Sequence, residues 1–127
     1  MSGDAQLGLW LSLCSTIAAD ACKDAGLDWC LVDMEHASND VASVLAQLQA
    51  LEGGSAALVR PAWNDPVLVK RLLDIGAQTL LFPMIQNAAE AEAAVAATRY
   101  PPRGVRGVSM TQRGNRYGRV AEYFAAG

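Results

Sequence analysis

The stretch DWCLVDMEHASNDVASVLAQLQAL (residues 28–51) contains the pattern that decides the fold. Its first part is an apolar run that ends in acids and in the only histidine of the chain, His36. Its second part, residues 38–51, has apolar residues at helical spacing, and the three polar residues at 38–40 are all candidate N-caps. The stretch therefore predicts a strand over 28–35 that is followed directly by an amphipathic helix.

The same strand–helix unit is predicted four times along the chain. The predicted strands are 7–13, 28–35, 55–62 and 79–85, and the predicted helices are 16–26, 38–51, 65–76 and 87–100. Residues 103–110 are expected to form a loop or a weak strand, and residues 117–126 a last helix. Strands this continuously apolar are typical of a parallel sheet that helices cover.

Two α/β architectures have this pattern. One is a doubly wound sandwich, and the other is part of a (β/α)8 barrel. The chain has neither G-x-G-x-x-G after its first strand nor G-x-x-x-x-G-K-[ST], so a nucleotide-binding sandwich lacks its usual fingerprint. Periodicity alone does not choose between the two.

The composition fits one globular domain over residues 1–127. Hydrophobic residues make up 52% of the chain and charged residues 18%, which predicts a substantial core. The net charge of −3 argues against a nucleic-acid partner. No apolar run approaches the roughly 20 residues of a membrane span, and the N-terminus has no basic region ahead of an apolar one, so we expect a cytoplasmic protein without a signal peptide.

Two further groups of residues are given structural interpretations. The three cysteines are spaced eight apart, which fits no zinc pattern, and we expect them to be small core residues without disulfides. A basic run near the end of the chain favours a solvated loop over a phosphate or subunit contact. Its arginines are at 99, 103, 106, 113, 116 and 119.

Polar side chains follow two of the predicted strands, where active sites gather in both architectures. Asp33, Glu35 and His36 end the second strand, and Arg60 ends the third. His36 is either an ordinary hydrogen-bonded histidine or a catalytic acid or base whose ring Asp33 orients. Arg60 either grips a substrate carboxylate or forms an internal salt bridge with Asp33 or Glu35. Asp74 lies near a predicted helix end, where the macrodipole disfavours an acid, so it is either paired or exposed.

Four strings in fixed order carry a family resemblance. They are D-x-E-H at 33–36, V-R-P-x-W-N-D-P at 59–66, K-R-L-L-D-x-G at 70–76 and R-Y-P-P-x-G-x-R-G at 99–107. With them, the chain from Leu7 to about Phe124 resembles the first half of the HpcH/HpaI-type class II pyruvate aldolases. The resemblance implies the first four units of a (β/α)8 TIM barrel, with no separate second domain.

The resemblance also implies a reaction. Such enzymes cleave 4-hydroxy-2-keto acids to pyruvate and an aldehyde, with a divalent metal ion (Mg2+, Mn2+ or Co2+) that stabilises the enolate. His36 would move the proton, Asp33 and Asp74 would assist it, and Arg60 would hold the carboxylate or enolate oxygen of pyruvate. A homo-oligomer, in this family often a hexamer, is expected.

The family's metal ligands lie in Q-I-E-[ST] and G-P-x-D-L strings, and neither string occurs here. We therefore expect no metal ligands in this chain, which would hold the acid–base and anion-binding half of the site and represent a truncated aldolase. The alternative is an inactive half-barrel fragment or assembly module. A citrate-lyase β-type enzyme acting on acyl-CoA thioesters is disfavoured, because the V-R-P-x-W-N-D-P string is more characteristic of the short aldolases.

Overall fold

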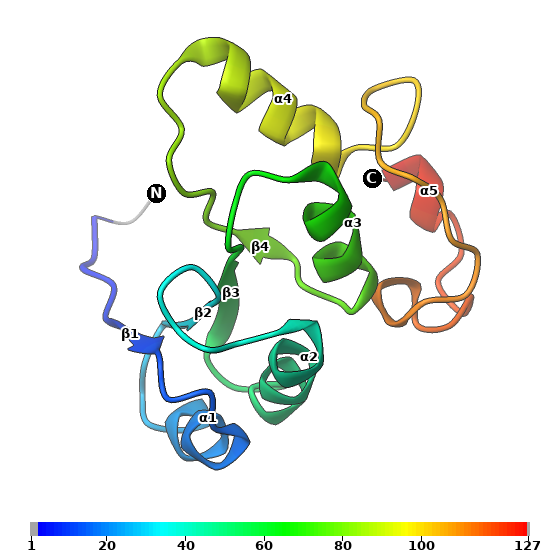
Figure 1. Ribbon diagram of the computed structural model, residues 1–127. Coiled ribbons are helices and arrows are strands. Elements are labelled where there is room, and N and C mark those ends of the chain that lie inside the picture. The colour runs from blue at the N-terminus through cyan, green and yellow to red at the C-terminus, as the bar shows by residue number, and fades with distance from the viewer. Residues whose placement is uncertain (1–2, 127) are drawn as a thin grey trace.

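The computed structural model describes residues 3–126, in which strands and helices alternate (Figure 1). The strands are β1 (Gly8–Leu11), β2 (Trp29–Asp33), β3 (Ala56–Arg60) and β4 (Thr79–Leu80). The helices are α1 (Thr16–Lys23), α2 (Val41–Ala50), α3 (Pro66–Asp74), α4 (Ala88–Thr98), the 3-10 helix η1 (Arg113–Asn115) and α5 (Tyr123–Ala126). The four predicted strand–helix units are confirmed.

The strands form one parallel sheet in the order β1-β2-β3-β4, so each strand lies beside the next one in the sequence. Figure 1 shows α1 to α4 following one another in an arc along the strands. A doubly wound sandwich reverses its strand order and has helices on both faces, whereas a barrel adds strands in one direction with all helices outside. The observed order therefore has the topology of a barrel.

Each of the helices α1 to α4 begins at a polar N-cap whose side chain accepts a backbone hydrogen bond. For α2 the cap is Asp40, which forms a reciprocal capping box with Ser43. For α3 it is Asp65, and Pro66 at the first helical position has no N–H that would need a partner. These local signals explain why the helix starts were readable in the sequence.

The core lies between the sheet and the helices. Cys30 and Val32 of β2, Val59 of β3, Val44 of α2 and Leu72 of α3 are all fully buried. The edge strands are more open, since Leu9 and Trp10 of β1 are both exposed by more than two fifths. All three cysteines are free, as expected, and burial raises the pKa of the Cys30 thiol.

Two predicted elements are wrong in extent. Strand β4 covers only Thr79–Leu80 instead of 79–85, because its neighbour β3 ends at Arg60 and the next residue, Pro61, has no N–H for the ladder. The last helix covers only Tyr123–Ala126 instead of 117–126.

The start of that predicted helix is prevented by its backbone. Arg116, Tyr117 and Gly118 have positive φ values of 52, 58 and 82°, which are incompatible with a right-handed helix. Residues 103–110 form a loop without a strand, in agreement with one of the two predicted alternatives. Within residues 3–126, no helix has the length and apolar character that crossing a bilayer requires.

Candidate active site at the strand ends

The carboxyl ends of β2 and β3 bring two of the predicted site residues together. Asp33 and Arg60 are register partners in the parallel ladder, and the backbone N–H of Met34 donates to the carbonyl of Arg60 at 2.9 Å. Because both side chains project from adjacent, paired backbones, their separation is set by the sheet rather than by a flexible loop. The sheet thus builds the centre of the candidate site.

Arg60 and Asp33 form a bidentate ion pair. The guanidinium Nε lies 2.9 Å from Oδ1 of Asp33, and Nη2 lies 2.9 Å from Oδ2. A second carboxylate, that of Glu35, has Oε2 2.8 Å from Nη1. Of the two alternatives for Arg60, the structure thus contains the internal salt bridge, with both of the acids that the sequence suggested.

The Asp33 carboxylate is buried, with its side chain only 3% exposed. The hydrogen bond from Arg60 lowers its pKa, against the opposing effect of burial. Its Oδ1 also accepts from the backbone N–H of Glu35 at 3.0 Å and of His36 at 3.5 Å. The same partnership raises the pKa of Arg60. Asp33 is therefore ionised and held in one position at neutral pH.

Trp10 of β1 completes the surroundings of the guanidinium. The Cζ of Arg60 lies 4.4 Å from the centroid of the Trp10 ring, which is cation–π distance. The sequence did not indicate this contact of Trp10, whereas Glu35 was one of the two suggested partners of Arg60. Trp10 lies here because of the order of the strands in the sheet, and that order cannot be read from strand and helix patterns in the sequence.

His36 lies at the outer side of this cluster. Its side chain is 74% exposed, and its Nε2 is 3.8 Å from Oε1 of Glu35, beyond hydrogen-bonding distance. That Asp33 orients the imidazole ring stays a prediction, and in this structure Asp33 contacts the backbone N–H of His36. Both Asp33 oxygens are occupied by Arg60, and Oδ1 meets the backbone rather than the ring of His36. The imidazole is thus free to meet a substrate from the solvent side.

Asp74 is not part of this cluster. Helix α3 runs back from the carboxyl ends of the strands, so Asp74 at its last position lies at the amino ends. Its Oδ1 lies 2.8 Å from Nη2 of Arg106, whose side chain is buried. Of the two explanations for an acid at a helix end, the structure thus shows the paired one.

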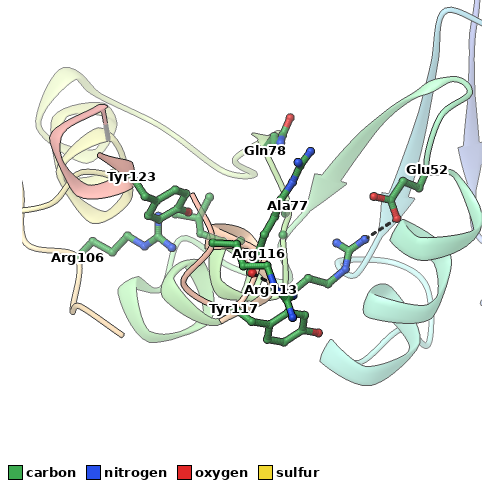
Figure 2. A pocket seen from close by; sticks show the side chains of 12 residues that line it. Glu52, Ala77, Gln78, Arg106, Arg113, Arg116, Tyr117 and Tyr123 are labelled. Atoms are coloured by element: carbon green, nitrogen blue, oxygen red, sulfur yellow. Dashed lines mark hydrogen bonds and ion pairs between the residues drawn. The ribbon is translucent and has the colours of Figure 1, made fainter. Parts of the chain in front are cut away.

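Arg106 also lines a cavity of about 680 Å³ near the amino end of β4 (Figure 2). The wall contains several arginines of the basic run, and Arg113 forms an ion pair with Glu52 at 3.2 Å. This cavity therefore lies at the opposite end of the sheet from Asp33, Arg60 and His36. These three residues, and not the arginine-lined cavity, have the arrangement expected at a barrel active site.

A metal site is a separate question. Among residues 3–126 there is no group of three or more His, Cys, Asp or Glu side chains that could hold a metal ion. The two carboxylates at the strand ends are already bound to Arg60. The described residues thus do not fit a metal ion, and the expectation that the ligands lie outside this chain stays a prediction.

The chain is similar to known proteins both in sequence and in structure. The family model described as HpcH/HpaI aldolase/citrate lyase matches residues 6–121. A protein of Klebsiella pneumoniae named 4-hydroxy-2-oxo-heptane-1,7-dioate aldolase is 57% identical over 124 residues, which is 96% of this chain and 47% of the relative. A protein of Salmonella typhimurium with the same name is 56% identical over the same length.

Solved structures show the same fold. An HpcH/HpaI aldolase/citrate lyase family protein from Burkholderia cenocepacia superimposes with a TM-score of 0.92 at 45% identity, covering 98% of this chain and 51% of that protein. An HpcH/HpaI aldolase from Desulfitobacterium hafniense has a TM-score of 0.75 at 34% identity, covering 85% of this chain and 42% of that protein.

The chain spans about half the length of the curated relatives that it matches. Its four parallel βα units are accordingly half of a TIM barrel. From the family model, the identity to the relatives and the superposition together, we conclude that this chain belongs to the HpcH/HpaI aldolase/citrate lyase family.

Proposed function

We propose that this chain supplies the acid–base and anion-binding half of an aldolase site that cleaves 4-hydroxy-2-keto acids to pyruvate and an aldehyde. The observation that carries the proposal is the Asp33–Arg60 ion pair beside an exposed His36, at the carboxyl ends of adjacent barrel strands. The names of the relatives support the same class of reaction.

Arg60 has the properties that the reaction requires of an anion-binding group. Cleavage of the C3–C4 bond of a 4-hydroxy-2-keto acid leaves negative charge on the C2 oxygen of the pyruvate enolate. A guanidinium that is already positioned stabilises such charge without reorganising during the reaction. Asp33 and Trp10 hold Arg60 in place, so in this proposal Arg60 contacts the substrate and Asp33 is a positioning residue.

His36 is the proposed proton carrier. The cleavage requires removal of the proton from the C4 hydroxyl and delivery of a proton to C3 of the enolate. An imidazole is the side chain whose ordinary pKa allows both steps near neutral pH. The exposure of His36 leaves its ring accessible to a substrate that lies over the strand ends.

Asp74 was expected from the family resemblance to assist His36. In this chain Asp74 instead forms an ion pair with Arg106, at the end of α3 that is far from His36. A catalytic role for Asp74 therefore does not form part of the single-chain proposal.

The divalent metal ion also belongs to the proposal only through the family resemblance, with ligands outside residues 3–126. No step is assigned to it here. The homo-oligomer and the cytoplasmic location remain predictions from the sequence.

The decisive experiment restores a complete barrel. Residues 1–127 are joined to the second half of the Klebsiella pneumoniae relative, and pyruvate release from 4-hydroxy-2-oxo-heptane-1,7-dioate is followed with added Mg2+, Mn2+ or Co2+. We expect His36→Ala and Arg60→Ala each to lower kcat/KM by about 10²- to 10⁴-fold. Gln49→Ala, on the exposed side of α2, is the matched control and should change it less than about twofold.

A folded chimera whose activity survives both site substitutions would overturn the assignment of roles. One that releases no pyruvate with any of the three metals would contradict the proposed reaction.

The second candidate is a non-catalytic half barrel. The observation in its favour is the lack of a metal-ligand cluster in the described part of the chain. Metal titration of the 127-residue chain does not separate the two candidates, because neither places metal ligands in residues 3–126. Complementation separates them: only the aldolase proposal predicts activity when the chain is supplied with the other half of a barrel.

A further inference from the structure

The guanidinium of Arg60 has two carboxylate partners that are held very differently. Asp33 binds both Nε and Nη2, its side chain is 3% exposed, and two backbone N–H groups also hold it. Glu35 makes one contact, from Oε2 to Nη1 at 2.8 Å, and its side chain is 13% exposed. Asp33 is therefore the fixed partner of Arg60, and Glu35 is the exchangeable one.

A carboxylate binds a guanidinium best through two parallel N–H donors. Since Asp33 occupies Nε and one N–H of Nη2, the pair that remains for a ligand consists of Nη1 and the second N–H of Nη2. The carboxylate of Glu35 lies 2.8 Å from Nη1 in an ion pair. An incoming carboxylate at this end of Arg60 would therefore lie beside Glu35 and compete with it for the charge of the guanidinium.

We propose that Glu35 is an internal competitor that occupies the substrate position on Arg60 until a keto-acid carboxylate displaces it. This inference rests on the proposed anion-binding role of Arg60 and extends it from the C2 oxygen to the adjacent carboxylate of the keto acid. On displacement, no covalent bond changes: the ligand carboxylate takes the place of Glu35 beside Nη1, and Glu35 moves away. The imidazole of His36 lies on its path, because Oε1 of Glu35 is already 3.8 Å from Nε2.

The exchange has a consequence for selectivity. Two carboxylates share one guanidinium in the ligand-free chain, so a third anion is repelled unless it replaces one of them. A neutral aldehyde makes no such replacement. The resident Glu35 thus favours ligands that carry a carboxylate over those that carry only a carbonyl group.

The test compares pyruvate binding to the wild-type chain and to Glu35→Gln and Glu35→Ala, with the Nε–H signal of Arg60 followed by 15N NMR. Removing the competitor should lower the Kd for pyruvate by about fivefold, which is about 1 kcal/mol and corresponds to one partly exposed ion pair. The Ala variant guards against a glutamine oxygen that still binds Nη1. Asp20→Asn removes an exposed carboxylate of α1 and should leave the Kd unchanged.

A second measurement needs no substitution. In the wild-type chain, the carboxyl 13C signal of Glu35 should shift as pyruvate saturates the Arg60 signal.

A third measurement uses the chimera. There, Glu35→Gln should lower KM for the keto acid, which loss of a purely structural residue would not do.

The outcomes separate the two proposals. If the chimera releases pyruvate and the wild-type chain binds it, but neither Glu35 variant binds it more tightly than Asp20→Asn does, the competitor role is wrong and the proposed function stands. A Glu35 carboxyl signal that does not respond to saturating pyruvate would also contradict the competitor role and leave the proposed function standing. If neither the wild-type chain nor the chimera binds pyruvate, both proposals fail.

Discussion

Replacing Arg60 by methionine removes the charge from the centre of the site and leaves most of the volume. The carboxylate of Asp33, 3% exposed, then loses two hydrogen bonds of 2.9 Å and its counter-charge. Removing one partner of a fully buried ion pair costs about 3–5 kcal/mol. Arg60 is 17% exposed and Asp33 keeps its backbone donors, so we expect the free energy of unfolding to fall by about 2–3 kcal/mol.

The loss should depend on pH in a defined direction. Because Arg60 lowers the folded-state pKa of Asp33, the pair stabilises the fold above the unfolded pKa of about 3.9, and this stability is lost as the pH falls through the folded pKa. Without Arg60, burial disfavours the ionised carboxylate. The difference between wild type and Arg60→Met should therefore be largest at neutral pH and become smaller in acid.

Urea unfolding followed by tryptophan fluorescence at neutral pH and at about pH 3, below the ordinary pKa of an aspartate, measures both effects. Arg71→Met, on the exposed side of α3, is the matched control and should change stability by less than about 0.5 kcal/mol. The reasoning is refuted if Arg60→Met behaves like this control, or if its deficit is the same at both pH values. The double variant with Asp33→Asn should recover part of the loss, because no buried charge is then left unpaired.

Two further predictions concern the local structure that supports the site. Gly8→Ala would drive a Cβ into the ring of Trp29 on the neighbouring strand and should lower the free energy of unfolding in urea by about 1–3 kcal/mol. The control Gly3→Ala has open space around it and should be neutral. Equal effects of the two substitutions would show that β1 and β2 do not pack as described. Asp65→Ala removes the N-cap side chain that accepts a hydrogen bond of 2.7 Å from the backbone N–H of Leu68, and it should lower the free energy of unfolding by about 1 kcal/mol. Thermal unfolding followed by circular dichroism measures this loss, and the control Asp65→Asn should be close to wild type. An alanine variant as stable as wild type would contradict the capping role.

The local elements were predictable because their signals are local. Helix α3 begins after Asp65 with Pro66 and ends near Gly76, whose φ of 101° suits glycine, and each of these features is written in neighbouring residues. Strand β4 was predicted too long for the opposite reason. Its apolar pattern continues to residue 85, but a strand also needs a paired backbone, and β3 offers none beyond Arg60.

The site was predictable in its centre and not in its surroundings. Asp33, His36 and Arg60 follow apolar runs, and the rule that parallel strands end at one edge brings them together. Asp74 could not be placed in this way, because its partner Arg106 is 32 residues away in a loop. The contacts of Arg60 with Glu35 and Trp10 depend on side-chain directions that no spacing rule specifies.

Hydrophobic periodicity, helix caps and strand-end chemistry are properties of short segments, so the amino-acid order was enough to predict alternating βα units and the acids, histidine and arginine that follow them. Periodicity left a barrel and a sandwich open, and the family resemblance implied the barrel. The strand order β1-β2-β3-β4 confirms it, and the contacts of Arg60 show that it is salt-bridged. Both are long-range facts: they depend on which backbones pair and which side chains meet across 27 residues of sequence, and the folded chain alone decides them.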